Sequence, residues 1–447
     1  MMYIEMCRIR TIVFSLVLAV TLGVLPRLGA AEPRTVKESI RLAIHQHPEV
    51  LARRVQQGIE QQELKYLEAE FLPKLTLALG VGREDSNNAS TRADNGRGSE
   101  EMERRESSLT LSQMLFDGFK THWQTKSQQA QMEALSFELR NLMSEVALRA
   151  VQSHLDVARA NLAFSDNIRN LEAHEKIAED VSQRVRSGKD NRAKINQIRS
   201  RLSLSMANVE AARQQVLDAG AEYVQNVGEA PERALSFQEG LISLPDSLAA
   251  FWESANQHNA SILAALSSQK AARNFSRAAE SGDYPSLYLQ SGASWNANMD
   301  GIEGRNSDAF VMFRMQYDLY QGGADKARQR QARLQIEQSQ WELAALRRDL
   351  RRDVEQVWHQ YQSGSRRIRL LQDYVESAEQ TKIAYEKQFD IGQRNLIDLL
   401  DAENEVLSAR KLLTDARKAL YYAKYQILHL QGNLLAQDGT QALEMTP

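Results

Sequence analysis

Cysteine is almost absent from this sequence. Its 447 residues include one cysteine, Cys7, within an N-terminal segment that has the features of an export signal. Arginines precede about fifteen mostly apolar residues, and the small residues Gly29-Ala30-Ala31 follow. We therefore expect residues 1–31 to be a signal peptide cleaved near Ala31, with a retained N-terminal anchor as the alternative. The mature chain would then contain no thiol, no disulfide and no cysteine metal site.

Long apolar runs are also lacking beyond Ala31. No window there offers about 18 continuous apolar residues, which excludes membrane-spanning helices from this part of the sequence. The net charge of -3 and the pI near 6.3 give no reason to expect nucleic-acid binding. Neither a nucleophile elbow nor a glycine-rich phosphate loop occurs in the sequence. We therefore expect neither an enzyme nor a bound cofactor or metal ion.

The chain contains two similar halves. At a constant offset of 204 residues, Gly118 corresponds to Gly322 and Gly188 corresponds to Gly392. Self-similarity over such a distance indicates a duplicated structural unit. The predicted segments are a first repeat at 32–226, a linker at 227–245, a second repeat at 246–435 and a C-terminal tail at 436–447.

Each half contains a region where apolar and polar residues alternate. This pattern predicts four strands in two hairpins, at 73–117 and 285–320, with a polar loop over 85–105. Each alternating run is about ten residues long, which suits a tilted strand of a membrane barrel. An open four-stranded sheet cannot lie in lipid, because its edges would leave backbone groups unpaired. If these strands enter a bilayer, several copies must associate; two would give about eight strands and three about twelve.

Very long helices are expected after the strands. From Gly118 to about Ser187 there is no proline, and roughly 70 helical residues would span about 100 Å. In the second half, Ser363-Gly364-Ser365 predicts a local irregularity. The residues expected at the junctions are Gly118, Gly322 and Gly323 between strand and helix, and Gly188, Gly392, Asn191 and Asn395 at the helix turns.

A stripe of acidic residues follows the second helix turn. Asp398, Asp401 and Glu405 are spaced to share one face of a helix. Asp398 has a structural explanation, because Asn395 can cap this helix and Asp398 can complement its dipole. That explanation does not extend to Asp401, which lies beyond the first turn. The equivalent positions of the first half carry Lys194, Gln197 and Arg201, so that stripe is basic.

Two motifs carry a family resemblance. LYQGGADKARQRQA (319–332) comes after the fourth predicted strand, and FDIGQRNLIDLLDAENEVLSARKLL (389–413) contains the acidic stripe. Together with the duplicated halves and the signal peptide, they resemble the TolC family of outer-membrane channel proteins over nearly all of the mature chain. In sequence, the two segments YDLYQGGADKAR and KQFDIGQRNLIDLLDAENE are more similar to the type I secretion subgroup than to the drug-efflux subgroups.

The resemblance implies an α+β membrane protein that assembles as a homotrimer. Three chains would build one twelve-stranded barrel in the outer membrane, continued into the periplasm by an α-helical barrel. Such a channel is a passive exit duct that works with an inner-membrane ABC transporter and a periplasmic adaptor, or membrane fusion, protein. We expect type I protein secretion, with the outer-membrane part of a drug or metal efflux pump as the alternative.

The resemblance also implies closure at the periplasmic end. The family has a ring of aspartate pairs there, and the matching residues are Asp398 and Asp401. An arginine just before the pair, matched by Arg394, links to a neighbouring helix in the family. Phe389 replaces the tyrosine of the best-known members, which removes one hydrogen bond. In this sequence the first turn has Lys194 at the position that would receive Arg394. Its side chain has neither the hydroxyl nor the carboxylate needed to accept a hydrogen bond from the arginine.

The basic stripe offers a substitute for that link. We hypothesise that Lys194 and Arg201 face the acidic stripe of Asp398, Asp401 and Glu405 across the mouth of the channel. Partly solvated ion pairs would then hold the mouth closed, each contributing about 0–1 kcal/mol.

Overall fold

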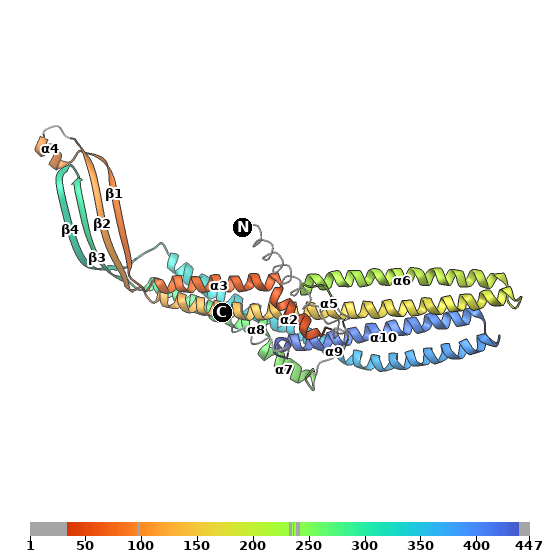
Figure 1. Cartoon of the computed structure of the whole chain (residues 1–447). Coiled ribbons are helices and arrows are strands. Elements are labelled where there is room, and N and C mark those ends of the chain that lie inside the picture. The colour runs from red at the N-terminus through yellow and green to blue at the C-terminus, as the bar shows by residue number, and fades with distance from the viewer. Residues whose placement is uncertain (1–33, 96–98, 232–234, 236, 238–241, 438–447) are drawn as a thin grey trace, which may run out of the picture.

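The computed structural model describes residues 34–95, 99–231, 235, 237 and 242–437. This part of the chain is elongated, with a sheet at one end and long helices extending from it (Figure 1). The predicted signal peptide (1–31) and residues 438–447 of the predicted tail lie outside the described residues.

Four antiparallel strands form one sheet in the order β1-β2-β3-β4. The strands have 13, 17, 14 and 15 residues, so they are longer than the expected ten. The predicted loop over 85–105 is wrong in extent, because the backbone ladder continues to the pair Ser86 and Glu100 and a short helix, α4 (Ala89–Asn95), lies beyond. Ladder hydrogen bonds use the backbone, so polar side chains do not end a strand. The strands are β1 (Lys74–Ser86), β2 (Glu100–Phe116), β3 (Ser286–Met299) and β4 (Ile302–Gln316).

The two faces of the sheet differ in character. Residues opposite one another in an antiparallel pair point to the same face, so the register defines rows across all four strands. Leu109 and Leu111, on the inner strand β2, are 37 % and 38 % exposed and belong to one face, here called the apolar face. The apolar face includes the rows Leu75, Leu111, Ser291, Val311 and Leu77, Leu109, Ala293, Ala309. The opposite polar face includes the rows Ala78, Ser108, Ser294, Asp308 and Gly80, Glu106, Asn296, Asn306.

Each hairpin continues into a helix of 67 residues, α5 (Lys120–Arg186) or α9 (Ala324–Asp390). At 1.5 Å per residue, both are about 100 Å long, as the sequence predicts. The irregularity predicted at 363–365 is wrong, because α9 is helical throughout that stretch. Gly364 faces Leu420 of the neighbouring helix, which a Cβ would approach to 3.4 Å. A contact at this distance is ordinary packing, so the helix simply tolerates a glycine here, at a cost of about 1 kcal/mol relative to alanine.

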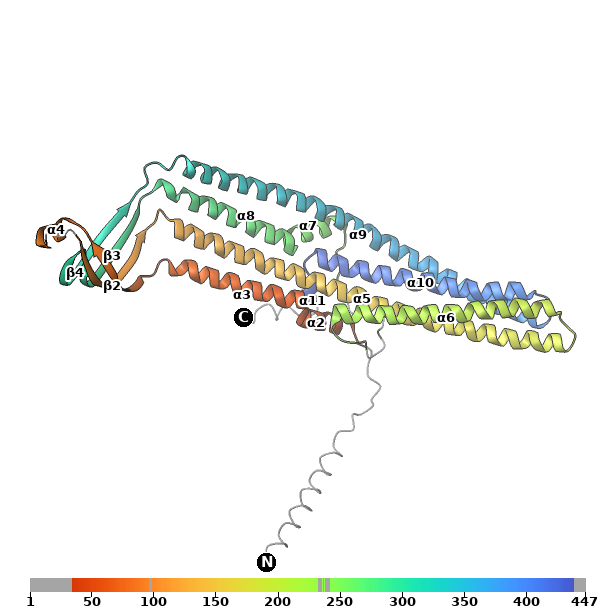
Figure 2. The same ribbon diagram turned by 90° about the horizontal axis from the view of Figure 1, so that it is seen from above.

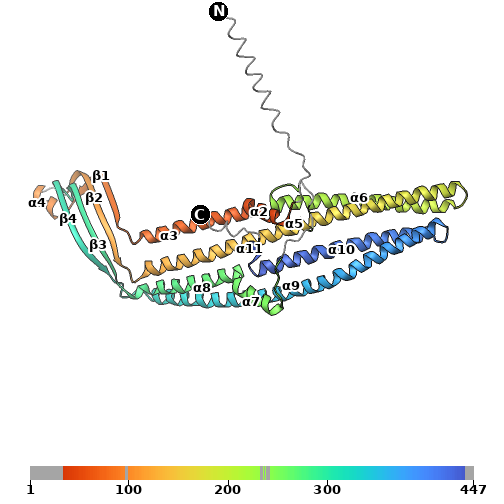
Figure 3. The ribbon, with the colours of Figure 1, turned by 60° about the horizontal axis from the view of Figure 1, so that its bottom comes forward.

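Shorter helices lie beside the long ones. Near the sheet, α5 packs against α3 and α8, and α8 packs against α9. Farther from the sheet, α5 packs against α6 and α10, and α10 packs against α9. The helices therefore form one curved layer, in the order α3-α5-α8-α9 and then α6-α5-α10-α9 (Figures 2 and 3). The shorter helices are α2 (Val36–Gln46), α3 (Pro48–Ala69), α6 (Arg192–Val227), α7 (Leu248–His258), α8 (Ala260–Ala279), α10 (Leu396–Leu430) and α11 (Leu434–Gln437).

The largest buried cluster lies at mid-length, where α2, α5, α6 and α10 meet. Ser39, His154 and Tyr223 are fully buried there, and the Ser39 hydroxyl lies 2.9 Å from His154 Nδ1 and 2.8 Å from the Tyr223 hydroxyl. A separate apolar cluster lies near the helix turns. The α5–α6 hairpin thus packs into apolar clusters both at mid-length and near its turn.

None of the helices in the described residues combines the length and apolar composition needed to span a bilayer.

Candidate functional site at the helix turns

The two helix turns lie side by side at the end of the molecule that is farthest from the sheet (Figure 1). Gly188 and Gly392 follow the long helices with φ angles of 73° and 75°, a conformation that glycine adopts without strain. Asn191 begins α6, and its side chain accepts a hydrogen bond from the Lys194 backbone N–H. Asn395 begins α10 in the same extended conformation without a side-chain capping bond. The two turns therefore share their backbone conformation, but only α6 has a side-chain hydrogen bond at its N-cap.

The acidic and basic stripes meet at one position. Arg201 Nη2 lies 3.0 Å from Asp401 Oδ1, joining α6 of the first half to α10 of the second. Both side chains are more than a third exposed, at 38 % and 60 %. An exposed pair of this kind is worth about 0–1 kcal/mol.

The other predicted stripe residues bind within their own halves. Lys194 Nζ lies 2.5 Å from Asp190 Oδ1 in the first turn and does not reach Asp398. Asp398 Oδ2 lies 3.5 Å from Arg394 Nη1 on the same helix end. Glu405 accepts a hydrogen bond from the Tyr374 hydroxyl of α9, which raises the pKa of that tyrosine.

Arg394 is held against its own helix hairpin. Its guanidinium lies 3.9 Å from the centre of the Tyr385 ring, and its Nε donates to Gln388 Oε1 at 3.0 Å. A cation over an aromatic face is stabilised by the ring quadrupole. In this single chain, these contacts direct Arg394 toward α9 and away from the first turn.

Arg184 makes contacts between the two helix hairpins that the sequence did not predict; these contacts, with Phe389 and Asp390, are called the Arg184 clasp. Arg184, on α5, places its guanidinium 4.5 Å from the centre of the Phe389 ring and donates from Nη2 to the Asp390 carbonyl oxygen at 3.1 Å. Its Nη2 also lies 3.9 Å from Asp390 Oδ1. Phe389, which cannot donate a hydrogen bond, therefore still contributes to joining the hairpins. The pairing depends on the distance between two helices, so no local motif in the sequence signals it.

More ion pairs link the halves above this clasp. Lys176 Nζ lies 3.1 Å from Glu386 Oε1, and Glu386 raises the pKa of Lys176 through this hydrogen bond. Farther along, Arg410 of α10 lies 3.4 Å from Asp166 Oδ1 of α5 and also pairs with Glu379 of α9. The α5–α6 hairpin and the α9–α10 hairpin are therefore joined by charged contacts along their facing sides.

The strand-to-helix junctions also depend on left-handed backbone. Gly118, Gly322 and Gly323 have φ angles of 69°, 65° and 85°. A Cβ on Gly118 would lie 2.7 Å from the Ser281 carbonyl oxygen, whereas nothing lies within 4 Å of the equivalent position on Gly322. Phe119 occupies the place that Gly323 has in the second half and keeps a φ of 64°.

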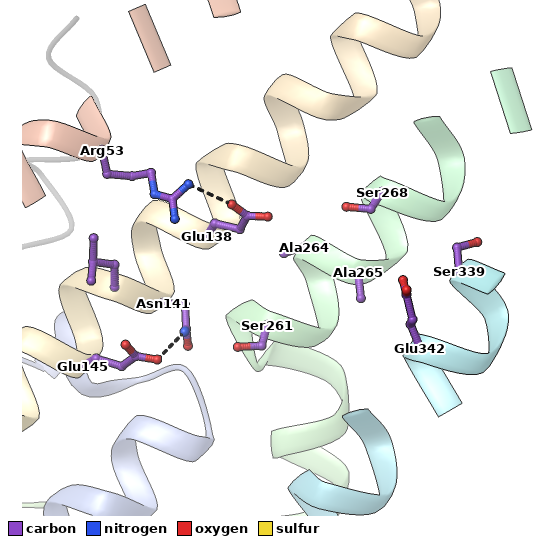
Figure 4. Close-up of a pocket in the computed structure, with 11 residues that line it drawn as sticks. Arg53, Glu138, Asn141, Glu145, Ser261, Ala264, Ala265, Ser268, Ser339 and Glu342 are labelled. Carbon is purple, nitrogen blue, oxygen red and sulfur yellow. Dashed lines mark hydrogen bonds and ion pairs between the residues drawn. The ribbon is translucent and has the colours of Figure 1, made fainter. Parts of the chain in front are cut away.

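A pocket of about 410 Å³ lies among α3, α5, α8 and α9 (Figure 4). Arg53 pairs with Glu138 at 3.2 Å, and Asn141 donates to Glu145 at 2.7 Å. Ser261, Ala264 and Ala265 line the α8 side. In the described residues, no group of three or more His, Asp or Glu side chains is arranged to hold a metal ion. Four of the polar side chains that line the pocket are thus paired with one another.

Comparison with known proteins decides the family. The family described as "Outer membrane efflux protein" matches residues 39–229 and 252–433, one match in each half. The chain belongs to this family. The resemblance to TolC that its two motifs carry is thereby confirmed, and as a family member the chain is an outer-membrane channel protein with a large helical periplasmic part.

Individual relatives match most of the length of this chain. Outer membrane efflux protein BepC of Brucella suis biovar 1 (strain 1330) is 26 % identical over 341 residues, covering 76 % of this chain and 75 % of BepC. Proteases secretion protein PrtF of Dickeya chrysanthemi is 24 % identical over 429 residues, covering 92 % of this chain and 91 % of PrtF. The crystal structure of CusC covers 90 % of this chain and 92 % of CusC, with a TM-score of 0.78 and 16 % identity, and so shares the fold.

Proposed function

We propose that this chain forms a homotrimeric exit duct through the outer membrane. The sheet supports this proposal most directly. Its edge strands β1 and β4 have no partner within the described chain, and its apolar face is exposed. Leu79 is 73 % exposed on β1, and Phe313 is 77 % exposed on β4. Lipid would cover such side chains, and neighbouring copies would pair the edges, because a bilayer tolerates no open sheet.

Three copies of this sheet would close a twelve-stranded barrel. The edges of the helical layer support the same assembly. Val55 and Ile59 on α3 are 66 % and 56 % exposed, and Trp341 on α9 is 68 % exposed. These helices lie at opposite edges of the layer near the sheet (Figure 2). In a closed ring, α9 of one copy would cover α3 of the next, burying both apolar edges.

The helical barrel would then end at the helix turns, and we propose a gate there. Asp398 and Asp401 would form a ring of carboxylates, with Arg394 and Glu405 beside it. Arg201 holds Asp401, and Lys194 is kept nearby by Asp190. Opening would require the α9–α10 hairpin to move away from the α5–α6 hairpin, which breaks the Arg201–Asp401 pair and the Arg184 clasp.

We propose type I protein secretion as the transport process, with an inner-membrane ABC transporter and a periplasmic adaptor as partners. The match to a proteases secretion protein over 92 % of this chain supports this choice. Efflux of drugs or metals is the second candidate, supported by the match to an outer membrane efflux protein over 76 % of the chain.

Two measurements test these proposals. The purified mature protein should form ion-conducting channels in a planar lipid bilayer, and an absence of channels would contradict the duct. A strain lacking this chain should lose secreted protein from its medium while its susceptibility to toxic compounds stays unchanged. Increased susceptibility with normal protein secretion would instead favour efflux.

A further inference from the structure

The apolar face of the sheet ends at a row that contains two arginines. Moving toward the α4 end of the sheet (Figure 1), the row Leu79, Ser107, Trp295, Ser307 is followed by Val81, Arg105, Ala297, Arg305. Trp295 is 54 % exposed. We call Arg105, Trp295, Ala297 and Arg305 the boundary patch.

The arginines of the boundary patch are exposed on the strands. Arg105 Nη2 lies 3.1 Å from Glu103 Oε2, and its side chain is 67 % exposed. Within the described chain, no carboxylate lies within ion-pair distance of Arg305. Farther out, Arg83 pairs with Glu101 at 3.3 Å. Arg305 is therefore a cation available to an external anion.

The opposite boundary of the apolar face has a different composition. Toward the helices, the last paired residues of this face are Leu287 and Met315, and the exposed aromatic residues Tyr317 and Tyr320 follow β4. Outward-facing cations on the strands thus occur at the α4 end and not at this end. A bilayer with the same headgroups on both sides gives no reason for such asymmetry, whereas a phosphate-rich lipid on one side does.

The geometry of the patch suits a phosphorylated sugar. Arg105 and Arg305 lie two strands apart in one row, which puts their backbones about 10 Å apart. Ala297, with its small side chain, lies between them in the row. Arginine recognises phosphate through paired hydrogen bonds, and Trp295 offers an amphipathic ring at the level where lipid headgroups begin.

We propose that the boundary patch binds the phosphorylated sugar headgroup of an outer-leaflet lipid. Arg105 and Arg305 donate hydrogen bonds to its phosphate, and the sugar packs against Trp295. This inference rests on the proposed insertion of the sheet into the outer membrane, and it adds a specific lipid partner to that proposal.

The test is a titration of the purified full chain in detergent with lipid A, in which bound lipid is counted by native mass spectrometry. Replacing both arginines (Arg105→Gln with Arg305→Gln) should weaken lipid A binding about thirtyfold. The matched control is Arg314→Gln, since Arg314 lies on β4 but points to the polar face. This control should bind lipid A as the wild type does.

Three results would overturn the proposal: equal binding by the double variant, equal binding of dephosphorylated lipid A by the wild type, or full competition by inorganic phosphate. If the double variant misfolds, Arg305→Gln alone should still lose about fivefold. Channel formation by the same wild-type sample is measured separately, as conductance in a planar bilayer. A sample that conducts but shows no phosphate-dependent lipid binding rejects the patch alone, whereas a sample that never conducts rejects the duct.

Discussion

The Arg201–Asp401 pair gives a direct test of the proposed gate. Replacing Asp401 by lysine removes one interhelical ion pair per chain and puts two cations side by side. Removing an exposed pair costs about 0–1 kcal/mol, and like charges about 4 Å apart in water repel by about 1 kcal/mol. Over three chains this amounts to about 3–6 kcal/mol, which would shift the closed-to-open equilibrium toward open by at least about a hundredfold.

The assay is single-channel conductance of the purified protein in a planar bilayer. Asp401→Lys should raise the mean conductance, and combining it with Arg201→Glu should restore the wild-type value by reforming the pair with reversed charges. Glu210→Lys is the matched control, because Glu210 is also exposed but pairs with Arg213 on its own helix and lies outside the proposed carboxylate ring. Its effect on conductance should be smaller. Unchanged conductance in Asp401→Lys, or no restoration in the swapped variant, would refute the reasoning.

Three other predictions concern stability and membrane insertion. Gly118→Ala should destabilise the protein more than Gly322→Ala in thermal unfolding, because both lose a left-handed glycine at about 1–2 kcal/mol but only the Gly118 site also clashes; equal shifts in melting temperature would contradict this. Leu77→Lys on the apolar face should cost about 2–4 kcal/mol in lipid and reduce assembly into membranes, whereas Ala78→Lys on the polar face should be tolerated; equal membrane yields would argue against a lipid-facing apolar surface. Burial lowers the pKa of His429 to about 4. The free energy of unfolding should therefore be highest above about pH 6.5 and should decrease by about 3 kcal/mol as the pH falls toward 4. His429→Gln should flatten that part of the pH profile in chemical denaturation, and an unchanged profile would assign the pH dependence to other groups.

Local patterns predicted most of the fold. Alternation at residues such as Leu75 and Leu77 revealed the strands, and long proline-free stretches revealed the two 67-residue helices. The extent of the hairpin loop was wrong because strand pairing is decided by backbone register rather than by side-chain polarity. Gly364 suggests a break, but a glycine inside a helix costs only about 1 kcal/mol, which the rest of a 67-residue helix overrides.

The candidate site was only partly predictable. Matching the two halves suggested opposite charges on two stripes, and Arg201 does meet Asp401. Lys194 instead binds Asp190, a nearer carboxylate in its own turn. No sequence pattern links Arg184 to Phe389, because their contact depends on how two long helices align across many turns. Sequence spacing describes neighbours on one helix, and it does not set the distance between helices.

One chain supplies too little sheet to close a barrel, and we propose that three chains share one. The most direct measurement is the mass of the mature protein extracted from membranes in detergent, by native mass spectrometry. We expect a particle of three chains that survives extraction. A single chain as the stable extracted species, or recovery of the protein outside the membrane fraction, would contradict the account.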